Sequence, residues 1–183
     1  MTVSWSMVDD ERRDFVALAE SLSSAEWDAR SLCSDWLVRD IVDHVVRRST
    51  PSGPAGPTVA ALIDRLRATI GATMTAGRST AADVLLETLV HQQDIRRPLG
   101  LVRMIPHARL RACLDHCKSS DRPNHTKQRI VGLRLFALDM DWSHGTGAEV
   151  KGTAEQLLMV MMGRMSVVGE LEGMGKGPLA QRD

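Results

Sequence analysis

The segment from about residue 80 to residue 97 constrains the fold most, because its pattern predicts a helix that is apolar on nearly every side. Its one polar stripe carries Glu87 and His91, which are four residues apart and therefore lie on the same face of the helix. A helix of this kind is normally buried, and polar side chains that are buried with it need partners. The chain should therefore fold as a set of helices packed around this one.

Helical periodicity predicts four more helices in the first two thirds of the chain, at about residues 7–23, 35–48, 58–75 and 106–119. Asp35 is the expected N-cap of the second of them, the Pro- and Gly-rich run 50–57 breaks the chain after it, and Gly77 ends the third.

The pattern changes after residue 121. It then predicts a strand at 130–138, a second strand near 140–143, a turn at Gly145–Gly147 and a helix at 153–164. The predicted fold class is mainly α: a helical bundle in residues 1–104, followed by a small α+β domain (strand–strand–helix) in residues 105–183.

Charge and composition exclude several classes of protein. Lysine plus arginine number 23 and aspartate plus glutamate also 23, so the chain lacks the basic excess typical of nucleic-acid binding. No apolar run reaches the ~20 residues that span a bilayer, and charged residues 9–13 lie where an export signal would be apolar. Three cysteines are too few for a disulfide framework. We therefore expect a cytoplasmic protein without nucleic-acid or membrane partners, with Arg12 of the charged run on its surface.

A third polar residue, His44, lies among valines on the predicted helix 35–48. With Glu87 and His91 it offers two imidazoles and one carboxylate from two facing helices, the ligand set of a catalytic zinc site with one open position. Ligands of one ion require the imidazole nitrogens of His44 and His91 to lie within ~7 Å, because zinc–nitrogen bonds are about 2.0–2.1 Å long. The spacing also fits histidines that are ordinary core or surface residues.

Several blocks of sequence carry a resemblance to a known family. They are Leu22–Asp28 (LSSAEWD) with Ser31–His44 (SLCSDWLVRDIVDH), then His91–Gly100 (HQQDIRRPLG), then Leu133–Gly147 (LRLFALDMDWSHGTG). In this order they resemble the mycothiol-dependent maleylpyruvate isomerase family, part of the DinB/YfiT-like metalloenzymes. The resemblance implies a DinB-like four-helix bundle holding a divalent metal, typically zinc, on His44, Glu87 and His91. It also implies mycothiol, an actinobacterial low-molecular-weight thiol, as co-substrate.

Two further residues are candidates for catalysis at such a centre. Asp94, about one turn beyond His91, could orient a ligand imidazole or take the thiol proton; it could equally be a solvated acid that pairs with Arg97. Arg48, one turn beyond His44, could hold a substrate carboxylate or could simply line a solvated face.

The leading functional hypothesis is a metal- and thiol-dependent isomerase or S-transferase that acts on a small electrophile. The short Pro- and Gly-rich stretch after His44 favours a second hypothesis, a non-catalytic metal- or ligand-binding protein of the same fold. A metal-dependent hydrolase needs only the open metal position and is the third. The oligomeric state stays open, with a homodimer as one alternative.

Other polar and aromatic residues are expected to be structural. Cys33 should pack rather than act as a nucleophile, and Trp36 should anchor the second helix in the core. Cys113, His116 and Cys117 share one face of helix 106–119, where buried, inert thiols without a disulfide are favoured over a metal site that lacks a fourth ligand.

Overall fold

The computed structural model describes residues 2–33, 35–49, 58–73, 79–119 and 126–182. The chain divides into two compact units, Met1–Arg103 and Met104–Asp183. Within the described residues it is mainly helical with a three-stranded sheet, which confirms the predicted fold class at this level. The predicted break at 50–57 and the predicted helix end at Gly77 lie outside the described residues.

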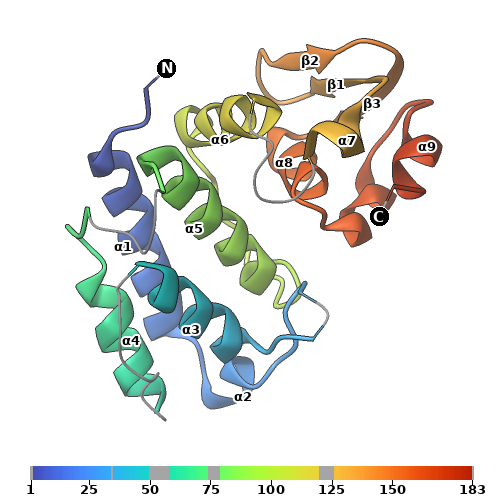
Figure 1. Cartoon of the computed structure of the whole chain (residues 1–183). Helices are drawn as coiled ribbons and strands as arrows, with labels where there is room; N and C mark the ends of the chain where they lie inside the picture. The colour runs from blue at the N-terminus through green and yellow to red at the C-terminus, as the bar shows by residue number, and fades with distance from the viewer. Residues whose placement is uncertain (1, 34, 50–57, 74–78, 120–125, 183) are drawn as a thin grey trace. The chain divides into compact units, whose positions relative to one another are not determined.

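The first unit consists of α1 (Trp5–Ser21), α2 (Ser24–Trp27), α3 (Val38–Ser49), α4 (Val59–Ala68) and α5 (Ala81–Arg96) (Figure 1). Helix α1 packs against α4 and α5, and α3 packs against the same two helices. The nearly all-apolar segment of the sequence is α5, and most of its residues are buried, as its composition predicts.

Local capping explains where these helices begin. The Thr80 side chain accepts a hydrogen bond from the backbone N–H of Asp83, whose side chain in turn accepts from the Thr80 backbone, so α5 begins at Ala81. The predicted cap at Asp35 is wrong, because α3 begins only at Val38. There the Asp40 carboxylate accepts from the Leu37 N–H at 2.9 Å and takes over the role of a cap.

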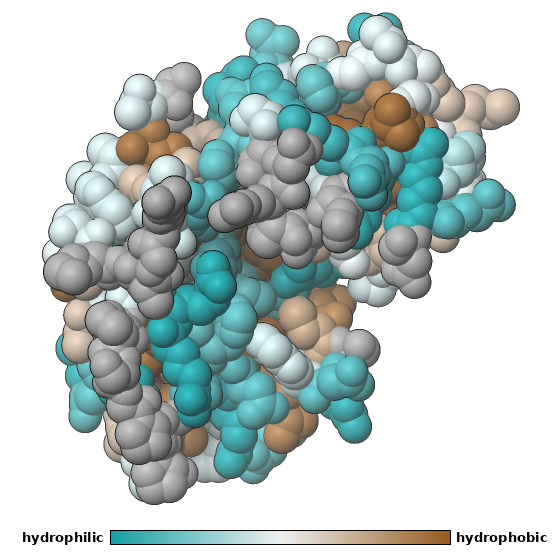
Figure 2. Space-filling model, viewed as in Figure 1, coloured by the Kyte–Doolittle hydropathy of each residue, from teal (hydrophilic) through white to brown (hydrophobic). Residues whose placement is uncertain are grey.

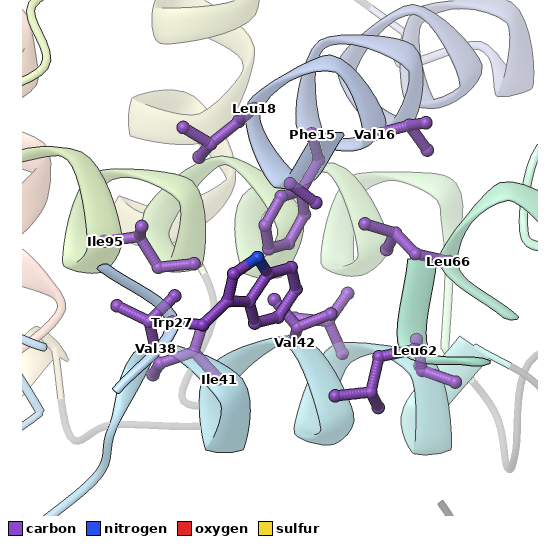
Figure 3. Close-up of a cluster of buried hydrophobic side chains, with 13 residues drawn as sticks. Phe15, Val16, Leu18, Trp27, Val38, Ile41, Val42, Leu62, Leu66 and Ile95 are labelled. Carbon is purple, nitrogen blue, oxygen red and sulfur yellow. The ribbon is translucent and has the colours of Figure 1, made fainter. Parts of the chain in front are cut away.

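Apolar side chains from α1, α2, α3 and α4 meet in the core of the first unit. Figure 3 shows the indole of Trp27 between Phe15 of α1 and the α3 side chains Ile41 and Val42. Trp27 is 1% exposed and is the buried tryptophan of this core, whereas Trp36 is half-buried at its edge. On the face seen in Figure 2, hydrophilic side chains predominate and hydrophobic ones form scattered patches.

A buried polar cluster joins α1 to α5. Glu11 is fully buried and its carboxylate accepts from Gln92 Nε2 at 2.7 Å and from Arg103 Nη2 at 2.5 Å. The expectation that Arg12 lies on the surface is wrong, since it is 1% exposed and donates to the Ala72 carbonyl at 2.7 Å. Two faces of α1 are covered, one by α4 and one by α5, so consecutive charged residues on it are buried.

The second unit consists of α6 (His107–Ser119), α7 (Thr126–Ile130), β1 (Leu133–Ala137), β2 (Ser143–Gly145), β3 (Ala148–Gly152), α8 (Ala154–Met161), the 3₁₀ helix η1 (Met165–Glu170) and α9 (Lys176–Ala180). No helix of the described part is long and apolar enough to cross a membrane.

The sheet has the strand order β2–β1–β3, with β2 antiparallel and β3 parallel to β1. The first predicted strand exists as β1, which is shorter than 130–138. The predicted strand at 140–143 is wrong over residues 140–142, because β2 begins only at Ser143. The turn between β2 and β3 passes around the start of β1, where a Cβ on Gly147 would come within 2.1 Å of the Gly132 carbonyl oxygen. Only glycine fits there, and this close passage places the unpredicted strand β3 beside β1.

Candidate metal centre

Helices α3 and α5 bring the three predicted metal ligands together. His44 projects from α3, and Glu87 and His91 project from one face of α5, which packs against α3. One ligand atom from each of the three residues lies within 4.8 Å of the other two. This separation is well inside the ~7 Å that a shared ion allows between the two imidazole nitrogens.

The donor atoms of this cluster fit a divalent metal ion. His44 Nε2 lies 3.1 Å from Glu87 Oε1, and two donors bound to one tetrahedral zinc ion are about 3.4 Å apart. The imidazole centroids of His44 and His91 are 5.1 Å apart with the rings nearly perpendicular. His91 is buried while His44 and Glu87 are half-buried, so the cluster lies at the edge of the core, within reach of solvent.

The Glu87 carboxylate is held in its charged form. Burial by itself would raise the pKa of Glu87, but hydrogen bonds from His44 and Arg48, with the positive charge of Arg48, outweigh it, and the pKa lies below its usual value. Arg48 Nε contacts Glu87 Oε1 at 2.6 Å, and its side chain is half-exposed. Arg48 therefore pairs with a candidate ligand as well as lining the solvated side of α3.

Asp94 is fully buried, so the alternative of a solvated acid is wrong. Its Oδ2 lies 2.9 Å from His91 Nδ1. A charged carboxylate can only accept, so this contact keeps the proton of His91 on Nδ1 and leaves Nε2 able to bind a cation. The geometry is that of a carboxylate that orients a histidine ring.

Residues 8–51 match the family described as the mycothiol maleylpyruvate isomerase N-terminal domain. This match supports the resemblance found in the sequence. The matched segment of the mycothiol maleylpyruvate isomerase N-terminal domain includes His44, whereas Glu87 and His91 lie beyond it on α5. No curated protein and no solved structure matches the chain.

Two residues of the same matched segment complete the surroundings of the cluster and were not predicted as site residues. The Cys33 thiol donates to Asp94 Oδ2 at 3.4 Å. The indole of Trp36 lies against both imidazoles, with centroids 4.8 Å from His44 and 6.5 Å from His91. The one feature of the sequence that could have indicated Cys33 and Trp36 is their position just before the helix that carries His44.

The cysteines of α6 lie apart from any such cluster. None of the three cysteines forms a disulfide, and Cys113 and Cys117 are buried. Burial raises the pKa of the Cys117 thiol to about 12. Within the described residues, neither cysteine nor His116 belongs to a group of three side chains close enough to hold a metal ion. Thiols of this kind are chemically inert.

Proposed function

We propose that the N-terminal unit binds a divalent metal ion, most simply zinc, through His44, Glu87 and His91. The observation that carries the proposal is the convergence of these donors within 4.8 Å, with Asp94 bound to Nδ1 of His91. Residues 1–104 are then a DinB-like four-helix bundle that holds the metal, and residues 105–183 a small α+β domain. Two imidazoles and one carboxylate leave an open position, as in catalytic zinc sites.

The function we infer is a thiol-dependent isomerase or S-transferase reaction on a small electrophile, with mycothiol as the co-substrate. The family match supports a mycothiol-related role. The charge balance supports a thiolate in the open position, because two neutral imidazoles, one carboxylate and a divalent ion sum to one positive charge. A bound divalent ion supplies the field that keeps a thiol deprotonated at neutral pH.

Residues around the ligands have separate roles in this proposal. Asp94 holds the ring of His91 in the tautomer that binds a cation through Nε2. Arg48 keeps Glu87 charged, and its half-exposed guanidinium can also receive an anionic group of the substrate. The Trp36 indole forms an aromatic wall beside both histidines and limits water there.

Metal content tests the first part of the proposal. Protein purified without added metal is analysed for zinc, nickel and manganese and then titrated with zinc. His44→Ala, Glu87→Ala and His91→Ala should each lose most of the bound metal, and a double variant should lose little more than a single one, because the ligands act as a unit. Arg13→Ala is the matched surface control, since Arg13 pairs with Asp10 on an exposed face. Wild-type protein that binds none of these metals would refute the proposal.

Turnover tests the second part. The metal-loaded protein is assayed for thiol consumption and for isomerisation over a panel of small electrophiles, with mycothiol and with a simple thiol. Activity should require both metal and thiol. Metal binding without any turnover would favour a non-catalytic binding protein, and turnover without a thiol would favour a metal-dependent hydrolase.

A further inference from the structure

We propose that Cys33 is a positioning residue for the metal centre: its thiol fixes the Asp94 carboxylate, which in turn fixes the ring of His91. The inference rests on the proposed metal site and assigns a role to a residue outside its ligand set. Cys33 and His91 both bond to the same atom, Asp94 Oδ2, at 3.4 and 2.9 Å.

The backbone around Cys33 is held in place independently of its side chain. The Leu32 N–H donates to the backbone carbonyl of Asp94 at 2.9 Å, which attaches this loop directly to α5. The Ser31 hydroxyl accepts from the Cys33 N–H at 3.2 Å and donates to the Trp36 carbonyl at 2.8 Å. The Trp36 N–H donates to the Cys33 carbonyl at 2.8 Å. These hydrogen bonds hold the Leu32 and Cys33 backbone beside α5 and present the thiol to Asp94.

Asp94 gains orientation from the Cys33 thiol. A buried carboxylate can rotate about its terminal bond, and each donor that bonds to it restricts that rotation. A thiol is a weak donor, but two donors that converge on one oxygen restrict the rotation. Trp36 stacks beside His91 with an interplanar angle of 25°, so the ring is confined by Asp94 at Nδ1 and by the indole at its face.

A competing arrangement is that Cys33 binds the metal directly. Cys33, His91 and Asp94 also offer ligand atoms within 4.8 Å of one another. In the observed geometry, however, the thiol donates to Asp94 and Nδ1 of His91 contacts the same carboxylate. A metal ion bound to these three residues would have to replace both hydrogen bonds. A metal ion on His44, Glu87 and His91 leaves both intact and replaces the contact between His44 and Glu87.

Cobalt binding distinguishes these arrangements. Wild-type protein and the variants Cys33→Ala, Cys33→Ser and Asp94→Asn are titrated with Co²⁺, and affinity and visible spectrum are recorded with the melting temperature of each metal-free protein. Asp94→Asn should weaken cobalt binding by about 10–100-fold. Cys33→Ala should weaken it by about 3–10-fold, as expected for one lost hydrogen bond outside the ligand shell, and should alter the ligand-field bands. Cys33→Ser keeps a donor and should restore most of the affinity and the wild-type spectrum.

The double variant Cys33→Ala with Asp94→Asn completes the experiment. If Cys33 acts through Asp94, its replacement should have no further effect on affinity once Asp94 is changed. Two results would overturn this inference and leave the proposed function standing. In the first, Cys33→Ala has the affinity and the spectrum of the wild type. In the second, Cys33→Ala lowers the affinity by the same factor whether or not Asp94→Asn is present. A sulfur-to-cobalt charge-transfer band in the wild type would also overturn it, because Cys33 would then be a ligand. Absence of cobalt binding by the wild type would overturn both.

Discussion

Replacing Glu11 by alanine should destabilise the N-terminal unit strongly, although Glu11 touches none of the proposed metal ligands. Its carboxylate is fully buried and is the closest counter-charge of Arg103, whose side chain is 10% exposed. It also accepts from the buried amide of Gln92. The substitution therefore leaves a nearly buried guanidinium without its main acceptor, whereas the Gln92 amide keeps the backbone carbonyl of residue 11 at 3.0 Å.

The size of the effect follows from what remains around Arg103. Breaking a buried ion pair by removing one partner costs about 3–5 kcal/mol. Arg103 keeps a longer contact with Asp14, at 3.7 Å, and a hydrogen bond to Gln93 at 3.1 Å. Because these partners remain, we expect the free energy of unfolding to fall by an amount at the lower end of this range, about 3 kcal/mol. With a urea m-value of roughly 1–3 kcal/mol/M, the unfolding midpoint should fall by about 1–3 M.

Urea unfolding followed by tryptophan fluorescence measures this loss, since Trp5, Trp27 and Trp36 all belong to the N-terminal unit. The paired variant Glu11→Leu with Arg103→Met removes both charges and should be more stable than Glu11→Ala. A loss below about 0.5 kcal/mol for Glu11→Ala, or a paired variant less stable than the single one, would refute the reasoning.

Three further outcomes are expected. In native protein Cys33 should react with an alkylating reagent well before Cys117, whose pKa is raised to about 12 by burial; peptide mass spectrometry after timed quenching gives the order, and equal rates would contradict it. Burial would raise the pKa of Asp115, but hydrogen bonds from a lysine and a tryptophan lower it. The charged Asp115 carboxylate therefore stabilises the fold above pH ~4, and this effect is lost as the pH falls. The melting temperatures of wild type and Asp115→Asn should therefore converge in acid. Ni²⁺ should quench wild-type fluorescence, and Trp36→Phe should abolish most of the quenching, because the indole of Trp36 lies beside both site histidines.

Sequence pattern predicts the elements of the candidate site well because their signals are local. Thr80 and Asp83 form a capping box within four residues, and the apolar surface of the following helix requires burial whatever surrounds it. The spacing of Glu87 and His91 guarantees a common helix face. Whether His44 faces these two residues depends on how α3 packs against α5. The resemblance implied this packing, whereas the spacing of residues alone did not.

Tertiary structure decides the features that the sequence pattern predicts wrongly or misses. Arg12 is buried because α1 contacts two helices, and the local sequence does not indicate that two faces of α1 are covered. The sequence Ala148–Gly152 has one strongly apolar residue, Val150, and becomes a strand only because the glycine turn before it returns the chain to β1. Cys33 contacts Asp94 across 61 residues of sequence, so its role is invisible to spacing.

Helix α5 is buried on most of its faces, and this burial separates stability from function. The helix buries polar side chains on two faces: Gln92 bonds to Glu11 on α1, while His91 and Asp94 form part of the candidate site, and residues 91 and 92 point about 100° apart. The Gln92–Glu11 hydrogen bond holds α5 against α1, and the Leu32 N–H donates to the Asp94 carbonyl near the end of α5, beside the site. His91, the proposed ligand, thus lies on a helix that is held on two sides, as a preorganised metal site requires. Changes at Glu11 should therefore act on the free energy of unfolding, and changes at Asp94 on metal affinity.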